Sequence, residues 1–392
     1  MIEIKEIETI IPASSRLGEV KEYYFSRKLR EIARLRANGV DVINLGIGSP
    51  DLSPDPVVID CLQEESGKDS THAYQSYIGV AELRNAFSDW YAQYFSVSLD
   101  PSTEVLPLMG SKEGIMHISM AFLNEGDEVL VPNPGYPTYS SAARLAGGSV
   151  RTYELKEHNN WLPDLESLSK TDLSKVKLMW VNYPQMPTGA TATTQLFKDL
   201  VVFAKAYNIL LVNDNPYAFI LNDEPLSILS VDGAKEVALE LNSLSKAHNM
   251  AGWRVGMLAG AKAYLDIVLR FKSNMDSGMF KPIQLAAAKA LQLPQSWYDQ
   301  QNEIYQARKE VVQQIIKVLN CKYDEQQVGL FIWAKIPLNF KNAYELSKQI
   351  LDNTAVFITP GGIFGTAGEQ YIRISLCSPI NILQSALNRI KQ

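Results

Sequence analysis

Short apolar runs alternate with amphipathic segments through the middle of the chain. Three runs show little polar alternation, as expected for strands that are buried on both faces; they cover residues 128–131, 177–182 and 208–214. Segments with helical periodicity cover residues 112–123, 194–206 and 261–269. Repeated strand–helix alternation predicts an α/β fold with a mainly parallel sheet and helices on both faces. Polar and proline-rich segments follow each run, so we expect a site at the carboxyl edge of that sheet.

The two ends of the chain depart from this alternation. Residues 23–38 predict a basic amphipathic helix, which is better explained by a solvated face than by a site for an anionic partner. A long polar helix is predicted over 294–318, followed by strands over 330–334 and 371–376. This pattern predicts a separate α+β lobe. The expected division is a large domain over 46–285 and a small domain that combines 1–45 with 286–392.

Composition limits the class of protein. The chain has 392 residues, of which 46% are apolar and 20% charged, as in a globular protein too long for one ordinary core. The net charge of -6 argues against a nucleic-acid partner. Cys61, Cys321 and Cys377 form no close pair, which favours free thiols over disulfides or a zinc site. The first eight residues are too acidic for a signal peptide and no apolar run could cross a bilayer, so we expect a cytoplasmic protein.

Lys246 lies among hydroxyls, glycines and an arginine in the run 243–256. A lysine that forms a Schiff base beside a phosphate needs such neighbours, because desolvation and a nearby cation make its amine nucleophilic. Ser243, Ser245 and Arg254 offer donors for that phosphate. A surface lysine would be the simpler reading of an isolated Ser-x-Ser-Lys. The Gly-Trp-Arg-Val-Gly continuation favours the reactive one.

Three further positions carry candidate chemistry. The Gly-Ser-Lys turn at 110–112 opens a predicted helix and suits a phosphate, although such a turn is usually only an N-cap. Asp214 ends a buried strand, where it either caps the next turn or pairs with a protonated ring nitrogen. Arg373 lies in an apolar strand and needs a carboxylate, which is either structural or part of a substrate.

In their order and spacing these residues resemble the pyridoxal-phosphate-dependent aminotransferases of fold type I, class I/II (the aspartate aminotransferase-like group). The resemblance runs from about residue 44 to residue 376. It is carried by Asn-Leu-Gly-Ile-Gly-Ser-Pro-Asp (44–51), Tyr-Gln-Ser-Tyr-Ile-Gly (74–79), Gly-Ser-Lys (110–112), Pro-Gly-Tyr-Pro (134–137), Pro-Thr-Gly (187–189), Asp-x-Pro-Tyr (214–217), Ser-x-Ser-Lys (243–246), Arg254 and Arg373. It implies a large domain with a seven-stranded sheet in three α/β/α layers, and a smaller α+β domain.

The resemblance also implies pyridoxal 5'-phosphate as cofactor and a ping-pong transfer of an amino group from an L-amino acid to a 2-oxo acid. Lys246 would hold the cofactor as a Schiff base and move the substrate proton, Asp214 would pair with the ring nitrogen, and Tyr217 would bond the phenolic oxygen. The other implied contacts are Tyr136 on the ring face, Asn182 near the ring, Gly110, Ser111, Lys112, Ser243, Ser245 and Arg254 at the phosphate, Tyr74 from the other subunit of a homodimer, and Arg373 with Gly48 at the substrate carboxylate.

One position departs from the family pattern. Most members read Asn-Pro-Thr-Gly where this chain has Met186 before Pro-Thr-Gly. A thioether cannot donate a hydrogen bond to the phenolic oxygen. We therefore expect a raised Schiff-base pKa, unless Asn182 or Gln185 compensates.

Substrate choice stays open at this stage. The segment 272–280 is similar to that of the LL-diaminopimelate and alanine/methionine-type branch, and no second cation for an acidic side chain can be assigned. Tyr23, Tyr24 and Phe25 either cover the pocket or, more simply, pack the first helix. A β-lyase that cleaves C–S bonds, or another carbon–heteroatom enzyme of this fold type, would share every cofactor residue named above. A non-enzymatic regulator would need a DNA-binding helical domain, for which too few residues precede residue 44.

Overall fold

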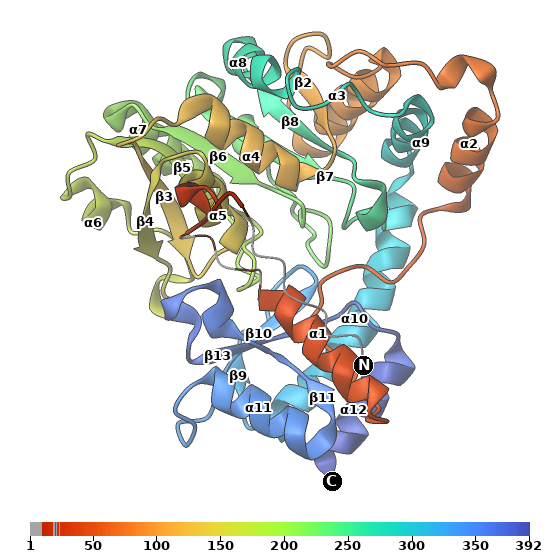
Figure 1. Ribbon diagram of the computed structural model, residues 1–392, viewed down its shortest axis with the longest axis vertical. Helices are drawn as coiled ribbons and strands as arrows, with labels where there is room; N and C mark the ends of the chain where they lie inside the picture. The colour runs from red at the N-terminus through yellow and green to blue at the C-terminus, as the bar shows by residue number, and fades with distance from the viewer. Residues whose placement is uncertain (1–9, 19, 21, 23) are drawn as a thin grey trace.

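The structure is a computed structural model that describes residues 10–18, 20, 22 and 24–392. Two lobes are visible, a larger one around a long sheet and a smaller one formed mostly by the C-terminal third (Figure 1). The acidic run at residues 1–8 and the candidate pocket residue Tyr23 lie outside the described residues.

A seven-stranded sheet forms the centre of the large lobe. In spatial order its strands are β2 (Val105–Leu108), β8 (Gly256–Gly260), β7 (Ala238–Ser243), β6 (Leu210–Asp214), β5 (Val176–Val181), β3 (Glu128–Asn133) and β4 (Ser149–Glu154). The pairs from β7 to β4 are parallel, whereas β8 runs antiparallel to both of its neighbours. The predicted α/β fold with a mainly parallel seven-stranded sheet is therefore confirmed.

Two apolar layers cover the faces of this sheet. On one face the alternate strand residues Val129, Trp180 and Val212 pack with residues of α4, α5 and α8. On the other face Leu130, Met179 and their neighbours pack with residues of α3, α7 and α9. The helices of this lobe are α2 (Pro56–Ser66), α3 (Ala81–Phe95), α4 (Ser111–Phe122), α5 (Pro137–Leu145), α6 (Leu165–Ser169), α7 (Thr194–Tyr207), α8 (Lys262–Lys272) and α9 (Lys281–Leu291).

The smaller lobe has its own sheets. Strands β12 (Thr359–Pro360), β13 (Tyr371–Ser375), β10 (Phe331–Lys335) and β9 (Lys322–Tyr323) form an antiparallel sheet, and β1 (Ile43–Asn44) pairs with β11 (Val356–Phe357) in parallel. The helices are α1 (Tyr24–Ala37), α10 (Gln295–Val318), α11 (Ala343–Thr354) and α12 (Ile380–Lys391). The proposed domain boundary at 285/286 falls inside α9, so the exact division of the chain stays a prediction.

An ion pair joins the loop between β1 and α2 to the long helix α10. Arg308 donates to both carboxylate oxygens of Asp51 at 2.6 and 2.9 Å. The basic helix α1 buries only Ile32 among its described residues, and Arg30 pairs with Glu22 at its exposed surface. Within the described part of the chain, no helix is both long and apolar enough to cross a membrane.

Candidate active site

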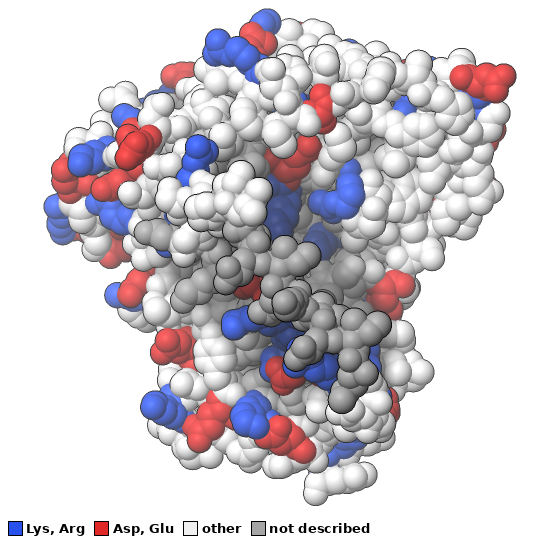
Figure 2. Space-filling view, viewed as in Figure 1, with Lys and Arg blue, Asp and Glu red and all other residues white. Residues whose placement is uncertain are grey.

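A cavity of about 470 Å³ lies at the carboxyl edge of the large sheet, where the small lobe meets it. The space-filling view shows a hollow between the lobes that contains several Lys and Arg side chains (Figure 2). Residues far apart in the sequence meet here. Of the residues implied by the resemblance, the cavity is lined by Gly48, Ser111, Lys112, Tyr136, Asn182, Asp214, Tyr217, Ser243, Ser245, Lys246, Arg254 and Arg373.

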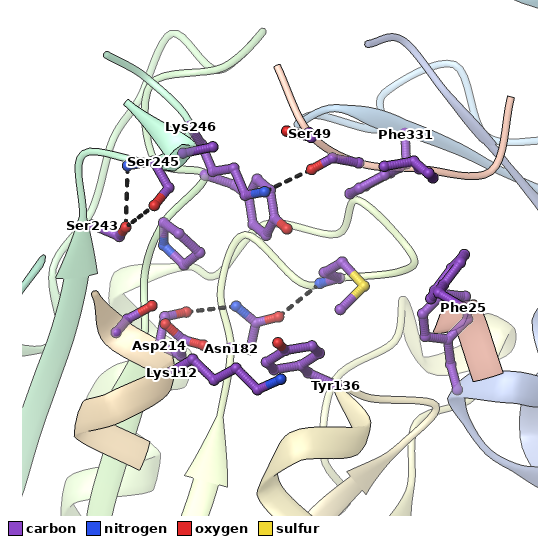
Figure 3. Close-up of a pocket in the computed structure, with 18 of the residues that line it drawn as sticks. Phe25, Ser49, Lys112, Tyr136, Asn182, Asp214, Ser243, Ser245, Lys246 and Phe331 are labelled. Atoms are coloured by element: carbon purple, nitrogen blue, oxygen red, sulfur yellow. Dashed lines mark hydrogen bonds between the residues drawn. The ribbon is translucent and has the colours of Figure 1, made fainter. Parts of the chain in front are cut away.

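Lys246 follows strand β7 and extends into this cavity (Figure 3). Its Nζ donates to the backbone carbonyl of Gly48 at 2.6 Å. Burial lowers the pKa of the ammonium, and the Arg373 and Arg254 guanidinium groups add to that effect, although Cys377 and Asp214 oppose it. A lowered pKa increases the share of neutral, nucleophilic amine near neutral pH.

Asp214 ends strand β6 and is only 4% exposed. The hydroxyl of Tyr139 donates to its Oδ2 at 2.8 Å, whereas Oδ1 has no hydrogen-bond partner among the described residues. Burial raises the pKa of Asp214 to about 6, and the Tyr139 hydrogen bond opposes that rise. A buried carboxylate with one unsatisfied oxygen is suited to a cationic N–H donor from a ligand.

The start of helix α4 faces a group of hydroxyl and guanidinium donors. Gly110 precedes the helix with a φ of 87°, and a Cβ at that position would lie 2.1 Å from Arg254 Nη2. Arg254 Nη1 lies 3.3 Å from Ser245 Oγ, which accepts from Ser243 Oγ at 2.9 Å. Backbone N–H groups at a helix N-terminus, together with a guanidinium and two hydroxyls, form a site that fits a phosphate. Gly110 does not line the cavity, and its missing Cβ leaves the space that the Arg254 guanidinium occupies.

Arg373 enters the cavity from strand β13 of the small lobe. Its Nη2 donates to the carbonyl of Gly46 at 2.8 Å, and its Nη1 lies 3.3 Å from the sulfur of Met186. The side chain is 4% exposed. A buried guanidinium at the wall of a cavity can bind a ligand carboxylate through two parallel hydrogen bonds.

Asn182 and Gln185, the two residues that could replace the hydrogen-bond donor missing at Met186, have different surroundings. Asn182 lines the cavity; its Nδ2 donates to the Asp214 carbonyl at 2.5 Å and its Oδ1 accepts from Met186 N at 2.9 Å. Gln185 instead donates to the carbonyl of Pro134 and accepts from Thr188, and it does not line the cavity. Of the two, only Asn182 is placed to contact a ligand.

Tyr74, Tyr24 and Phe25 differ in their position relative to the cavity. Tyr74 is 90% exposed and does not line the cavity of its own chain. Phe25 does line it, together with Leu29 of the same helix, whereas Tyr24 packs against Phe25 and Tyr344.

The sequence analysis missed Tyr139, Phe331 and Phe364, which also line the cavity. Tyr139 lies one helical turn after Tyr136, so the spacing of these two tyrosines was an available signal. The two phenylalanines gave none, because an aromatic residue in an apolar strand or loop looks the same whether it faces a core or a ligand.

Residues 40–390 match the model of the family described as aminotransferase class I and II. The chain belongs to this family. It is 40% identical to an LL-diaminopimelate aminotransferase of Aquifex aeolicus over 96% of this chain and 98% of the relative. Its fold superposes on the apo structure of BacF from Bacillus subtilis with a TM-score of 0.94 at 34% identity, covering 97% and 98% of the two chains. A mutant aspartate aminotransferase of Thermus thermophilus, at 24% identity and a TM-score of 0.90 over 97% and 99% of the chains, shares the fold.

The chain is therefore an aminotransferase that depends on pyridoxal phosphate. The geometry of the cavity fits that cofactor. The unpartnered Oδ1 of Asp214 suits a pyridinium N–H, and the donors around Gly110 suit a phosphate. In this aminotransferase the half-buried Lys246 lines the same cavity as both of these features.

Proposed function

We propose that Lys246, Asp214 and Arg373 divide the work of the amino transfer among them. The observation that carries this proposal is their convergence on one cavity from three different parts of the chain, with a depressed pKa at Lys246 and a free carboxylate oxygen at Asp214. Pyridoxal phosphate, when bound, supplies an electron sink for the charge that develops on the substrate α-carbon.

The cofactor-binding residues act by position and charge. Asp214 would accept a hydrogen bond from the ring nitrogen of the cofactor and favour its protonated form, while Tyr139 orients the carboxylate. Tyr136 and Tyr217, which line the cavity, would hold the ring of the cofactor, and the N-terminus of α4 with Ser243, Ser245 and Arg254 would hold its phosphate.

Lys246 moves the proton of the reaction. Its Nζ lies 2.6 Å from the carbonyl oxygen of Gly48, which also lines the cavity. As a neutral amine, Lys246 would remove the α-proton of the substrate, hold it on Nζ and give it back later in the transfer. Arg373 binds the α-carboxylate and so places the α-carbon within reach of this amine.

We propose LL-diaminopimelate as the first amino donor to test. The finding that supports it is that relatives of that name are about 40% identical over nearly the whole chain. The experiment exposes the cofactor-loaded protein to single amino donors and follows the change of cofactor absorbance to the pyridoxamine form. LL-diaminopimelate, methionine, alanine and aspartate form the panel of donors, and cystathionine is added in a separate reaction to detect C–S cleavage.

The outcomes of this experiment separate the alternatives. Conversion to the pyridoxamine form by at least one donor, reversed by a 2-oxo acid, supports amino transfer. Release of pyruvate and ammonia from cystathionine without that conversion would instead support the C–S β-lyase alternative. Failure of every donor to change the absorbance would reject the proposed roles.

We also propose a homodimer in which Tyr74 completes the site of the partner chain. Tyr74 is exposed in the single chain, and Tyr77, Met275 and Phe280 are further exposed apolar residues near it in the sequence or in the facing segment. Gly278 lies against the Gln75 carbonyl, which joins these two segments. Mixing a Lys246→Ala protein with a Tyr74→Phe protein tests this: recovery of one intact site per mixed dimer is expected, and an activity that is only the average of the two variants would contradict it.

A cytoplasmic location is proposed on the cysteines. All three are free thiols, and Cys321 and Cys377 are buried. Thiols of this kind suit a reducing compartment. Fractionation of cells that express a tagged chain, with the tag found outside the cytoplasm, would contradict the proposal.

A further inference from the structure

Phe331 begins strand β10, beside the strand that carries Arg373. In the antiparallel register Arg373 faces Trp333, and Phe331 faces Ser375. Phe331 is therefore diagonal to Arg373 and on the same face of the sheet, a separation that an aromatic side chain can bridge. The Arg373 guanidinium carbon lies 3.8 Å from the centre of the Phe331 ring.

The same ring also contacts the segment that holds Lys246. A Cβ added to Gly48 would lie 2.2 Å from Phe331 Cζ, so the ring edge is packed directly against the Gly48 backbone. The Gly48 carbonyl accepts the 2.6 Å hydrogen bond from Lys246 Nζ. Figure 3 shows Phe331 next to Ser49 and near the end of the Lys246 side chain. One ring thus lies between the arginine and the acceptor of the lysine.

Contact with aromatic faces limits how the guanidinium can turn. Arginine has several rotatable bonds, and its bidentate binding of a carboxylate requires one orientation of a planar group. The Phe331 face at 3.8 Å is the nearest ring, while Phe364 and Phe25 lie at 4.6 and 5.6 Å. Because Arg373 is only 4% exposed, the cation–π attraction acts in a largely desolvated setting, where it is stronger than at a surface.

We propose that Phe331 is a positioning residue of the amino transfer, which holds Arg373 in the orientation that binds the substrate α-carboxylate. The inference rests on the proposed role of Arg373. It explains why one ring contacts both Arg373 and Gly48. The group that binds the substrate carboxylate and the carbonyl that accepts from the Lys246 amine are then held apart by the same side chain.

The test compares Phe331→Leu with Phe203→Leu in the cofactor-loaded protein. Leucine keeps the apolar character and removes the ring face. Phe203 lies on α7, is 6% exposed like Phe331, and does not line the cavity, so its substitution measures the general effect of losing a buried ring. For each protein we would measure the rate with two substrates. One is the best amino acid donor of the panel, and the other is its decarboxylated amine, which has no α-carboxylate.

Loss of positioning should act only on ligands that carry the carboxylate. In Phe331→Leu we expect KM for the amino acid to rise between about 10-fold and 30-fold, with kcat changed less than about threefold. The decarboxylated amine should react at an unchanged rate, within about twofold. The affinity for a carboxylate without an amine, measured by calorimetry, should fall by the same factor as KM rises. The affinity for the cofactor should be equal to that of the wild type.

Each other result overturns the inference. Equal losses for the amino acid and for its decarboxylated amine would show a general distortion of the site, as would equal effects of Phe331→Leu and Phe203→Leu. An unchanged KM in Phe331→Leu would show that Arg373 needs no such support. Failure of the proposed function is distinguishable, because then the wild-type protein itself would not react with any donor.

Discussion

Replacement of Asp214 by asparagine should make the cofactor-free protein more stable and its complex with the cofactor weaker. Burial raises the pKa of this carboxyl from 3.8 to about 6 in the folded chain. In the unfolded chain the carboxyl is solvated and ionises near its ordinary value. The folded state therefore binds the extra proton between those two pH values, and stability falls as the pH rises through that interval.

The magnitude follows from the size of the rise. A difference of about two pH units corresponds to about 3 kcal/mol, which the folded protein has lost once the pH exceeds about 6. Asparagine has almost the same shape, keeps an oxygen for the 2.8 Å bond from Tyr139, and carries no charge to desolvate. We expect the cofactor-free variant to be more stable than the wild type by up to about 3 kcal/mol near pH 8, and by almost nothing near pH 4.

When the cofactor is bound, we expect the wild type to be favoured over the Asp214→Asn variant. The protonated ring nitrogen of the cofactor would pair with Asp214, and breaking such a buried pair by removing one partner costs about 3 kcal/mol or more. Cofactor affinity of the variant should therefore fall at least ~100-fold. The assay is urea unfolding of both cofactor-free proteins at several pH values, with cofactor titration in parallel. The reasoning is refuted if the variant shows no gain in stability near pH 8, or if its gain shrinks as the pH rises from 4 to 8.

Three further substitutions test the site. Lys246→Ala should reduce turnover by at least ~10⁴-fold, because the proton-moving amine is lost, and borohydride should no longer fix the cofactor to the chain; persistent fixation would place the reactive lysine elsewhere. Tyr139→Phe removes the hydrogen bond to Asp214 and should weaken cofactor binding about 5-fold to 10-fold, as measured by titration, and an unchanged affinity would show that the hydroxyl does not orient the carboxylate. Met186→Asn restores a donor near the ring and should lower the pKa at which the absorbance of the bound cofactor changes; an unchanged spectrophotometric pH titration would contradict this.

Much of the fold was predictable because the central strands are buried on both faces and leave continuous apolar runs. The first and last residues of the strands and helices were less predictable. The predicted strand over 208–214 begins at Leu210 instead, because Asn208 takes a left-handed φ of 55° and caps helix α7. The antiparallel direction of β8 was also absent from the pattern, since a short apolar strand looks the same in either direction.

Some residues of the site could likewise be predicted from the sequence, and others could not. Asp214 and Arg373 were recognisable because a charged residue in or at the end of an apolar strand requires an explanation. Lys246 was recognisable by the hydroxyls and the arginine that lie around it in the sequence. The contribution of Phe331 depends on its register with strand β13, which no periodicity within one strand reveals. Gln185 and Asn182 were equivalent candidates in the sequence, and only the hydrogen bonds of the folded loop distinguish them.

Arg373 belongs to the small antiparallel sheet, whereas Asp214 ends one strand of the large sheet and Lys246 follows another. A ligand that contacts Arg373 and Asp214 therefore connects the two sheets across the seam, by which we mean the contact surface between the two lobes. Compounds that only bind, and never react, should therefore slow amide hydrogen exchange along that seam, well beyond the atoms they contact. The length of such a compound would decide how strongly it restrains the two lobes against each other.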